Sequence, residues 1–133
     1  MTRTEFADFA AQQDARNTIE LNIRKYTLML CDALEQNFKS RNRGTVGRHE
    51  APSYKFVIES GRKYHKIIME VPNHNRPASR SVHAFVDKKT GEVYKAASFK
   101  APAKHVRFNL LLINDREWLL EHADWAGGYL YKR

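Results

Sequence analysis

The segment from Tyr54 to Val71 decides the fold, and it reads YKFVIESGRKYHKIIMEV. Large apolar side chains stand at every second position from Tyr54 to Ile58, which is typical of a half-buried strand. Ser60-Gly61-Arg62 has the residue types of a turn, and an apolar-rich stretch from Tyr64 to Val71 follows it. The segment therefore predicts an antiparallel β-hairpin.

A second hairpin is predicted beyond a polar loop at residues 72–77. Its strands are Val82–Asp87 and Glu92–Ala97, and its turn is Lys88–Gly91, where Gly91 is free to adopt a positive φ. Four strands in this order fit an antiparallel meander. One face of such a sheet packs on a helix, and the other faces solvent or a partner.

Helices are predicted on both sides of the sheet. Thr4–Phe38 carries apolar side chains at three- and four-residue spacing, which predicts one long helix, or two if the chain breaks at Asn17-Thr18. Pro102–Leu112 and Arg116–Asp124 predict two short helices, because proline is favoured at the first helical position. Tyr129–Tyr131 is predicted to be short and extended.

The fold class is therefore α+β. A chain of 133 residues supports one domain, residues 1–133, with a helical arm at 1–40 and a sheet-plus-helix body at 52–133. The single cysteine, Cys31, excludes an intramolecular disulfide. No apolar run reaches the ~18 residues of a membrane helix, and Glu5 and Asp8 lie where a signal peptide would be basic and then apolar. We expect a cytoplasmic protein without a membrane partner.

Positive charge is concentrated in the middle of the chain. The net charge is +8, and the stretch from Lys39 to Arg107 holds sixteen Lys and Arg against five Asp and Glu. A field of this sign attracts anions, so nucleic acid or a phosphate-rich small molecule is the expected partner. A solvated surface that keeps the protein soluble is the alternative interpretation.

The charges are densest where the fourth predicted strand leads into the predicted Pro102 helix. A helix N-terminus presents unpaired N–H groups that bind phosphate or carboxylate. Cations in this stretch would hold phosphates, and Phe99 would stack on a base. A solvated helix start with Phe108 in the core is the alternative. The candidate ligand-binding residues here are Lys95, Ser98, Phe99, Lys100, Lys104, His105 and Arg107.

Basic residues outside this stretch predict contacts with nucleic acid. They lie in the polar loop after the long helix and in the turn of the first hairpin, and aromatic residues interleave with lysines on the hairpins. Sheets bind single strands through such surfaces, although any half-buried strand can show the same alternation. The candidate nucleic-acid-binding residues are Arg41, Arg43, Arg48, Arg62 and Lys63.

Catalysis is not expected. The six histidines show no spacing typical of a metal site, and the sequence holds no Walker loop, G-x-G-x-x-G or G-x-S-x-G motif. His83 and His105, near Lys95 or Lys104, could in principle cleave RNA by general acid–base chemistry, but a lone histidine is more often structural. We expect no enzyme, no metal and no cofactor.

The segment Ser81–Asn109 resembles one found in many small tailed-phage proteins. It contains the patterns D-x-x-T-G, Y-K-x-A-S and A-P-x-K-x-x-R, and the C-terminal stretch Ala123–Tyr131 is also similar to theirs. More loosely, the size and plan of the chain are similar to those of the phage Thoeris anti-defence proteins, which bind cyclic nucleotide signals. That resemblance implies homo-oligomers with ligand pockets at subunit junctions. The positions it implies are Arg107, Asn109, Phe85, Lys95 and Phe99, with Phe85 as a second ring that could stack on a base.

The leading hypothesis is a non-catalytic phage-type protein that binds phosphate-bearing nucleotides and sequesters a cyclic nucleotide defence signal in the host cytosol. Two alternatives stay open. One is a DNA- or RNA-binding protein of phage host takeover, and the other is an inhibitor that presents its basic face to an acidic host protein.

Overall fold

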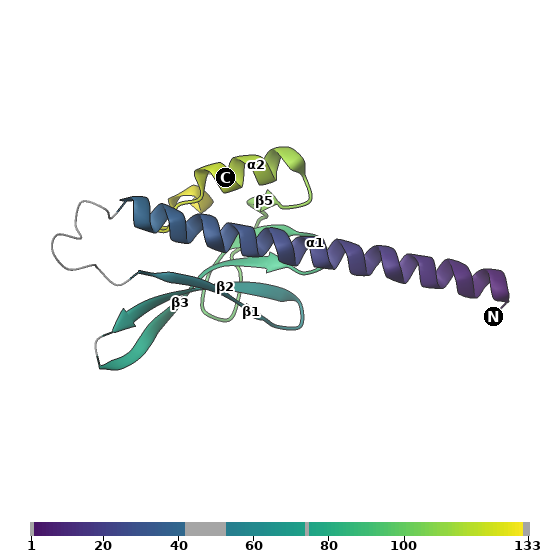
Figure 1. Ribbon diagram of the computed structural model, residues 1–133, viewed down its shortest axis with the longest axis horizontal. Helices are drawn as coiled ribbons and strands as arrows, with labels where there is room; N and C mark the ends of the chain where they lie inside the picture. Colours follow the sequence, from purple (N-terminus) through teal and green to yellow (C-terminus); the bar gives the residue numbers. More distant parts are fainter. Residues whose placement is uncertain (1, 42–52, 74, 132–133) are drawn as a thin grey trace.

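The computed structural model describes residues 2–41, 53–73 and 75–131. Neighbouring strands pair antiparallel in the order β1-β2-β3-β4-β5, and α1 lies across one face of this sheet (Figure 1). The predicted α+β class is therefore confirmed. In chain order the elements are α1 (Arg3–Arg41), β1 (Lys55–Ser60), β2 (Tyr64–Asn73), β3 (Arg76–Asp87), β4 (Glu92–Lys95), β5 (Phe108–Asn109), α2 (Ile113–His122) and the 3-10 helix η2 (Gly128–Tyr131).

The N-terminal helix is one continuous element of 39 residues. It begins with a capping box, in which the Thr2 hydroxyl accepts the Glu5 N–H at 3.1 Å and the Glu5 carboxylate accepts the Thr2 N–H at 2.9 Å. The alternative break at Asn17-Thr18 does not occur. The Thr18 hydroxyl instead donates to the Asp14 carbonyl one turn back, so it does not cap a new helix.

The core lies between the C-terminal half of α1 and the sheet. Ile23, Leu30 and Leu34 of α1 are fully buried, as are Ile67 and Val86 of the sheet. Cys31 is also buried, and burial raises the pKa of its thiol to about 12. The three- and four-residue spacing of the helix sequence thus marks the face that packs on the sheet. The N-terminal half of α1 projects beyond the body (Figure 1).

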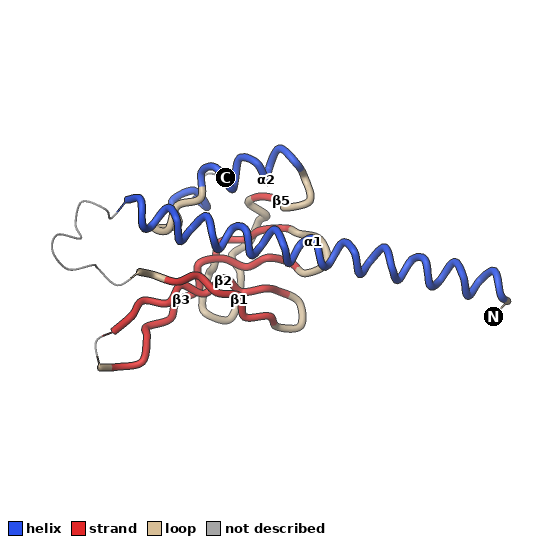
Figure 2. The backbone as a smooth tube through the Cα atoms, viewed as in Figure 1, coloured by secondary structure: helices blue, strands red, loops and turns tan. Residues whose placement is uncertain are grey.

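Both hairpin turns form where they were predicted. Tyr64 O accepts the N–H of Gly61, and Asp87 Oδ1 accepts the N–H groups of Lys89 and Thr90. Gly91 adopts a φ of 77°, as expected. The second and third strands are longer than predicted, because β2 and β3 continue as a two-stranded ribbon that projects from the sheet (Figure 2).

The predicted helix at Pro102–Leu112 is wrong. Ala96 and Pro102 form an antiparallel bridge, and the carbonyls of Lys95 and Val93 accept the N–H groups of Ala103 and Arg107. The chain therefore returns along the free edge of β4 and adds the fifth strand, β5. A free strand edge offers a row of carbonyl and N–H groups, and this pairing outweighs the local preference of Pro102 for a helix start.

The C-terminal end also differs from the prediction in detail. The predicted helix at Arg116–Asp124 is α2, which begins three residues earlier, at Ile113, and ends at His122. Tyr129–Tyr131 belongs to the 3-10 helix η2 and is not extended. Tyr129 and Leu130 are buried against the sheet, so the C-terminal segment completes the core beside α1.

Candidate ligand-binding cleft

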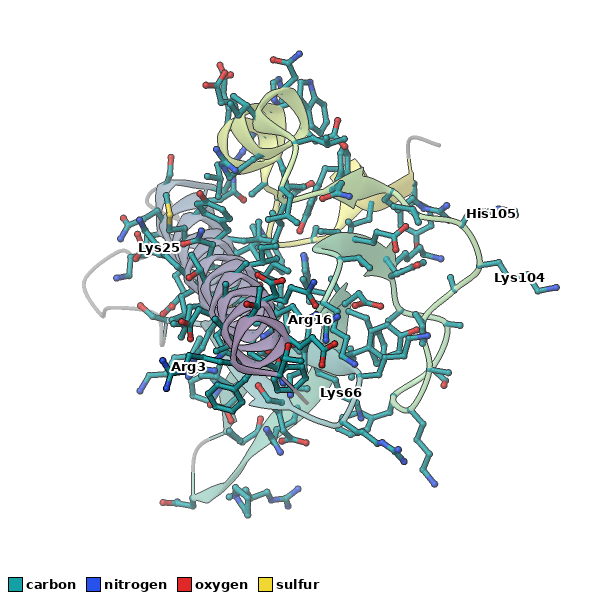
Figure 3. The ribbon with its side chains drawn as sticks, turned by 90° about the vertical axis from the view of Figure 1, so that its right-hand side faces the viewer. Arg3, Arg16, Lys25, Lys66, Lys104 and His105 are labelled. Carbon is teal, nitrogen blue, oxygen red and sulfur yellow. The ribbon has the colours of Figure 1, made fainter. Side chains whose placement is uncertain are left out.

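The anion site predicted at a helix start does not form, because no helix begins at Pro102. Lys100 and Lys104 lie on the exposed loop that follows β4. Figure 3 shows the side chains of Lys104 and His105 pointing away from the body. His105 has a φ of 74°, so the loop bends sharply there.

The Arg107 side chain donates hydrogen bonds to backbone carbonyls. Its Nε donates to the carbonyl of Leu130 at 2.8 Å, and Nη1 donates to the carbonyls of Lys104 and His105 at 3.5 and 3.3 Å. These bonds join the loop after β4 to the C-terminal segment. Nε and Nη1 of the guanidinium group are therefore engaged by backbone carbonyls.

Two further predicted ligand residues shape turns. The Ser98 hydroxyl accepts the N–H groups of Lys100 and Ala101 at 3.3 and 3.2 Å. The side-chain carbonyl of Asn109 accepts the N–H of Leu111 at 2.8 Å. Both side chains accept hydrogen bonds from nearby backbone N–H groups. This local role accounts for the two residues, and no ligand is needed to explain them.

Phe85 and Phe99 both lie near Lys66, on the face of the sheet opposite α1. The Lys66 ammonium group lies 4.7 Å from the centre of the Phe99 ring and 5.8 Å from that of Phe85. Phe99 is 46% exposed, whereas Phe85 is 1% exposed and meets Tyr64 edge-on. Phe85 therefore cannot stack on a base, while Phe99 can, and sequence reasoning did not assign Lys66 to the site.

The candidate nucleic-acid-binding residues do not gather at one place. Arg41 ends α1, whereas Arg62 and Lys63 lie in the turn between β1 and β2, at the other end of β1. Arg43 and Arg48 lie outside the described residues. The described members of this set thus do not form one patch.

A cleft of about 360 Å³ lies between the sheet and the C-terminal segment. We call it the Lys95 cleft. Its volume falls within the range usual for small-molecule sites. Its lining residues are Met69, Ser81, Val82, His83, Lys95, Ala96, Trp125, Ala126, Gly127, Leu130 and Tyr131.

Lys95 and Tyr131 give this cleft its chemistry. The Lys95 ammonium group lies 4.2 Å from the centre of the Tyr131 ring, and this ring is 67% exposed. Both ion pairs found among the described residues belong to Arg80, so Lys95 has no carboxylate partner there. The lining contains no Asp or Glu. The cleft therefore attracts an anion and offers it an adjacent aromatic ring.

His83 forms the floor of the cleft. It is the extra residue of a bulge in β3, between the pairs Ile67–Ala84 and Ile68–Val82. Its Nε2 lies 2.8 Å from the Tyr129 hydroxyl. Burial lowers the pKa of His83 to about 4, with the Asp124 charge opposing this shift, and burial raises the pKa of Tyr129. At neutral pH both groups are uncharged, so Lys95 is the one charged side chain among the residues that line the cleft.

The sequence model of DUF7717, a family of unknown function, matches residues 6–132. The chain belongs to this family. No curated protein and no solved structure matches it. The match to DUF7717 spans both the projecting half of α1 and the Lys95 cleft.

Two general properties of this DUF7717 chain bear on the site. Within the described ranges, no helix combines the length and apolar character that crossing a membrane requires. In the same part of the chain, no three His, Cys, Asp or Glu side chains are placed to hold a metal ion. The candidate site therefore rests on one lysine, one neutral histidine and aromatic rings.

Lys95 is among the ligand residues predicted from the sequence, and His83 was considered only as a candidate for RNA cleavage. The other residues that line the cleft were not predicted. His83 and Tyr129 are 46 residues apart in the chain, and only the fold brings them together. Trp125 and Tyr131 lie in the C-terminal stretch Ala123–Tyr131, which enters the sequence analysis only through its resemblance to phage proteins. The density of aromatic residues near Gly127-Gly128 was the one local signal that could have indicated a site there.

Proposed function

We propose that the chain is a non-catalytic protein that binds a phosphate-bearing nucleotide in the Lys95 cleft. The observation that carries this proposal is the Lys95 ammonium group, which lies 4.2 Å from the exposed Tyr131 ring and has no carboxylate partner among the described residues. A phosphate would bind the ammonium group through charge-assisted hydrogen bonds. The base would stack on an aromatic ring, which contributes ~1–3 kcal/mol.

Binding without turnover is supported by the state of His83. A general base needs a pKa near the working pH and a clear path to the substrate. The pKa of His83 is lowered to about 4, and its Nε2 is engaged by Tyr129. The looser resemblance to the phage Thoeris anti-defence proteins suggests the biological role, which would be capture of a cyclic nucleotide defence signal in the host cytoplasm.

Calorimetric titration with cyclic dinucleotides, cyclic mononucleotides and nucleoside monophosphates tests this proposal. We expect Lys95→Gln to weaken binding by about ten- to a hundredfold, because a hydrogen bond to a charged group is lost. Lys104→Gln is the matched control, since Lys104 lies on the exposed loop outside the cleft, and it should leave the affinity unchanged. Folded protein that gives no heat with any of these nucleotides would contradict the proposal.

Single-stranded nucleic acid is a second candidate ligand, favoured by the Lys66 ammonium group over the exposed Phe99 ring. Such a ligand would bind along the sheet face opposite α1 by stacking and phosphate contacts. Its affinity would increase with oligonucleotide length and decrease steeply with salt. A nucleotide in the Lys95 cleft would show little dependence on length. Lys66→Gln, compared with Lys95→Gln, separates the two candidates.

We also propose that the chain forms an antiparallel homodimer through the projecting half of α1. Residues 2–19 are exposed except for Ala10, and they include Phe6 at 63% and Phe9 at 50% exposure. A helix of about 20 residues in water depends on packing for most of its stability. The helix face that carries the core residues continues along this segment at three- and four-residue spacing as Phe6, Phe9, Gln13 and Arg16, of which the two phenylalanines are apolar.

Charge decides the orientation of this dimer. Parallel helices in register would place Arg16 against Arg16 of the second copy. An antiparallel pair that overlaps along the whole projecting segment places Phe9 opposite Gln13 and Arg16 beside Phe6 and Glu5 of the other copy. This arrangement covers the phenylalanines and gives Arg16 a carboxylate partner.

Light scattering coupled to size-exclusion chromatography tests the dimer. We expect the native chain to elute with twice the mass of one chain, and the double variant Phe6→Gln/Phe9→Gln to elute with the mass of one. Leu21→Gln is the control, because Leu21 is 67% exposed and lies on another side of α1. A native chain that stays monomeric at high micromolar concentration would contradict the proposal.

A further inference from the structure

A second cavity lies at the other end of the sheet, where α1 passes the turns that join β1 to β2 and β3 to β4. Its volume is about 500 Å³. We call it the His65 cavity, and it shares no lining residue with the Lys95 cleft. Its lining residues are Asn17, Glu20, Leu21, Arg24, Ser60, His65 and Lys88.

His65 is the buried polar group of this cavity. The side chain is 4% exposed, and its Nδ1 lies 2.6 Å from the Ser60 hydroxyl. In the described part of the chain, every buried side-chain nitrogen or oxygen has a hydrogen-bond partner. Ser60 engages Nδ1, Nε2 has no hydrogen bond to another described side chain, and His65 lines the cavity. One ring nitrogen is thus available to a ligand.

Two cations border the same cavity. Lys88 donates from Nζ to the Gly61 carbonyl at 3.1 Å, which holds its ammonium group beside the β1–β2 turn, and Arg24 lines the cavity from α1. Burial, and then the charges of Lys88 and Arg24, lower the pKa of His65. Neither cation has an ion-pair partner within the described ranges, where both pairs belong to Arg80. The lining includes one carboxylate, Glu20.

We propose that the His65 cavity binds a phosphate group between Arg24 and Lys88, with the Nε2–H of His65 as a buried hydrogen-bond donor. An anion at this position selects the tautomer in which Nε2 carries the proton and the Ser60 hydroxyl donates to Nδ1. Arg24 supplies planar paired donors and Lys88 a point charge, the two side-chain types that bind phosphate best. The phosphate can be free inorganic phosphate or the phosphoryl group of a mononucleotide. This site is independent of the Lys95 cleft.

The test follows the side-chain ¹⁵N signals of His65 during titration of ¹⁵N-labelled protein. Inorganic phosphate, adenosine 5′-monophosphate and adenosine are added in separate titrations. We expect a saturable shift of the Nε2 signal with one or both phosphate-bearing probes and none with adenosine. If inorganic phosphate saturates the shift, free phosphate is sufficient for binding. If only the monophosphate does so, the ligand is the phosphoryl group of an ester.

Variants then assign the contacts. Arg24→Gln and Lys88→Gln should each weaken binding by about tenfold or more, because each removes a charge-assisted hydrogen bond. Lys25→Gln is the matched control, since Lys25 is the next residue on α1 but lines a different groove, between α1 and α2. Urea unfolding of each variant shows that it is folded. Lys95→Gln should leave this binding unchanged, so the two proposed sites succeed or fail separately.

Three outcomes would overturn the proposal. The first is the absence of a saturable His65 shift with either phosphate-bearing probe. The second is an equal response to adenosine, which would show that phosphate is not what binds. The third is unchanged affinity in the folded double variant Arg24→Gln/Lys88→Gln.

Discussion

His83, which is half-buried, and His65, which is buried, lie on the same face of the sheet and have contrasting surroundings. Each meets a hydroxyl group, Tyr129 at 2.8 Å and Ser60 at 2.6 Å. Burial lowers the pKa of both imidazoles. His83 packs against the rings of Phe56 and Tyr129 and is bonded through Nε2 at the Lys95 cleft, whereas His65 is bonded through Nδ1 and lines a cavity with two cations. The comparison teaches that the neighbours of a buried histidine decide whether it supports the fold or can receive a ligand.

The largest expected difference between the two histidines is in how much each contributes to the loss of stability in acid. The pKa of His83 is about 4 in the folded chain and 6.5 in the unfolded chain, so the unfolded state binds the extra proton first. The contribution of His83 to the free energy of unfolding is fully present above pH 6.5. It decreases as the pH falls towards 4 and levels off below that. At ~1.4 kcal/mol per pH unit, the loss reaches about 3 kcal/mol. Urea unfolding measured between pH 4 and 7 checks this expectation.

Two variants show how much of this pH dependence comes from each histidine. His83→Gln keeps a group that can bond to Tyr129 but removes the titration, so it should flatten most of the pH dependence. His65→Gln should flatten less of it, because the pKa of His83 is lowered further than that of His65. Equal flattening in the two variants would show that the histidines are not different in the way proposed.

Removal of each hydroxyl partner should produce the next largest difference. Tyr129→Phe leaves Nε2 of His83 buried without a partner, and we expect it to lower the free energy of unfolding by about 1–3 kcal/mol. Ser60→Ala should cost less than about 1 kcal/mol, because Ser60 is exposed and water can take the place of its hydroxyl at Nδ1 of His65. Urea unfolding at pH 7 measures both. A larger loss for Ser60→Ala would mean that the His65 cavity supports the fold more than the floor of the Lys95 cleft does.

The parts of the fold that local sequence determines were predictable. The turns at Ser60-Gly61-Arg62 and Lys88–Gly91 depend on neighbouring residues, and they form as expected. The Pro102 helix was wrong because β4 offers the carbonyls of Val93 and Lys95, and pairing with this distant edge outweighs a local preference. Local patterns carry little information about which strand edge remains free.

The sites are also hard to predict from the sequence, because they depend on contacts between segments that are far apart in the chain. Lys95 could be found from the density of charge, but its aromatic neighbour Tyr131 belongs to a segment 36 positions away that folds back onto the sheet. The bulge that turns His83 towards Tyr129 leaves no mark in the alternation of β3. Lys104 and Arg107 were expected to act together, yet one is exposed and the other is bonded to backbone carbonyls.

The smallest expected effect tests whether Arg24 acts on His65 through charge alone. Arg24→Gln removes one of the two cations that lower the pKa of His65, so this pKa should move back towards 6.5, because an adjacent positive charge disfavours the imidazolium form. The pKa of His83 should not change, since Arg24 is not among its perturbing groups. Proton NMR of the histidine ring signals in phosphate-free buffer, from pH 4 to 8, measures both values in one sample. The Lys25→Gln variant gives the baseline for loss of a neighbouring charge on α1. If Arg24→Gln left the pKa of His65 where it is, Arg24 would be too far from the imidazole to share a phosphate with it.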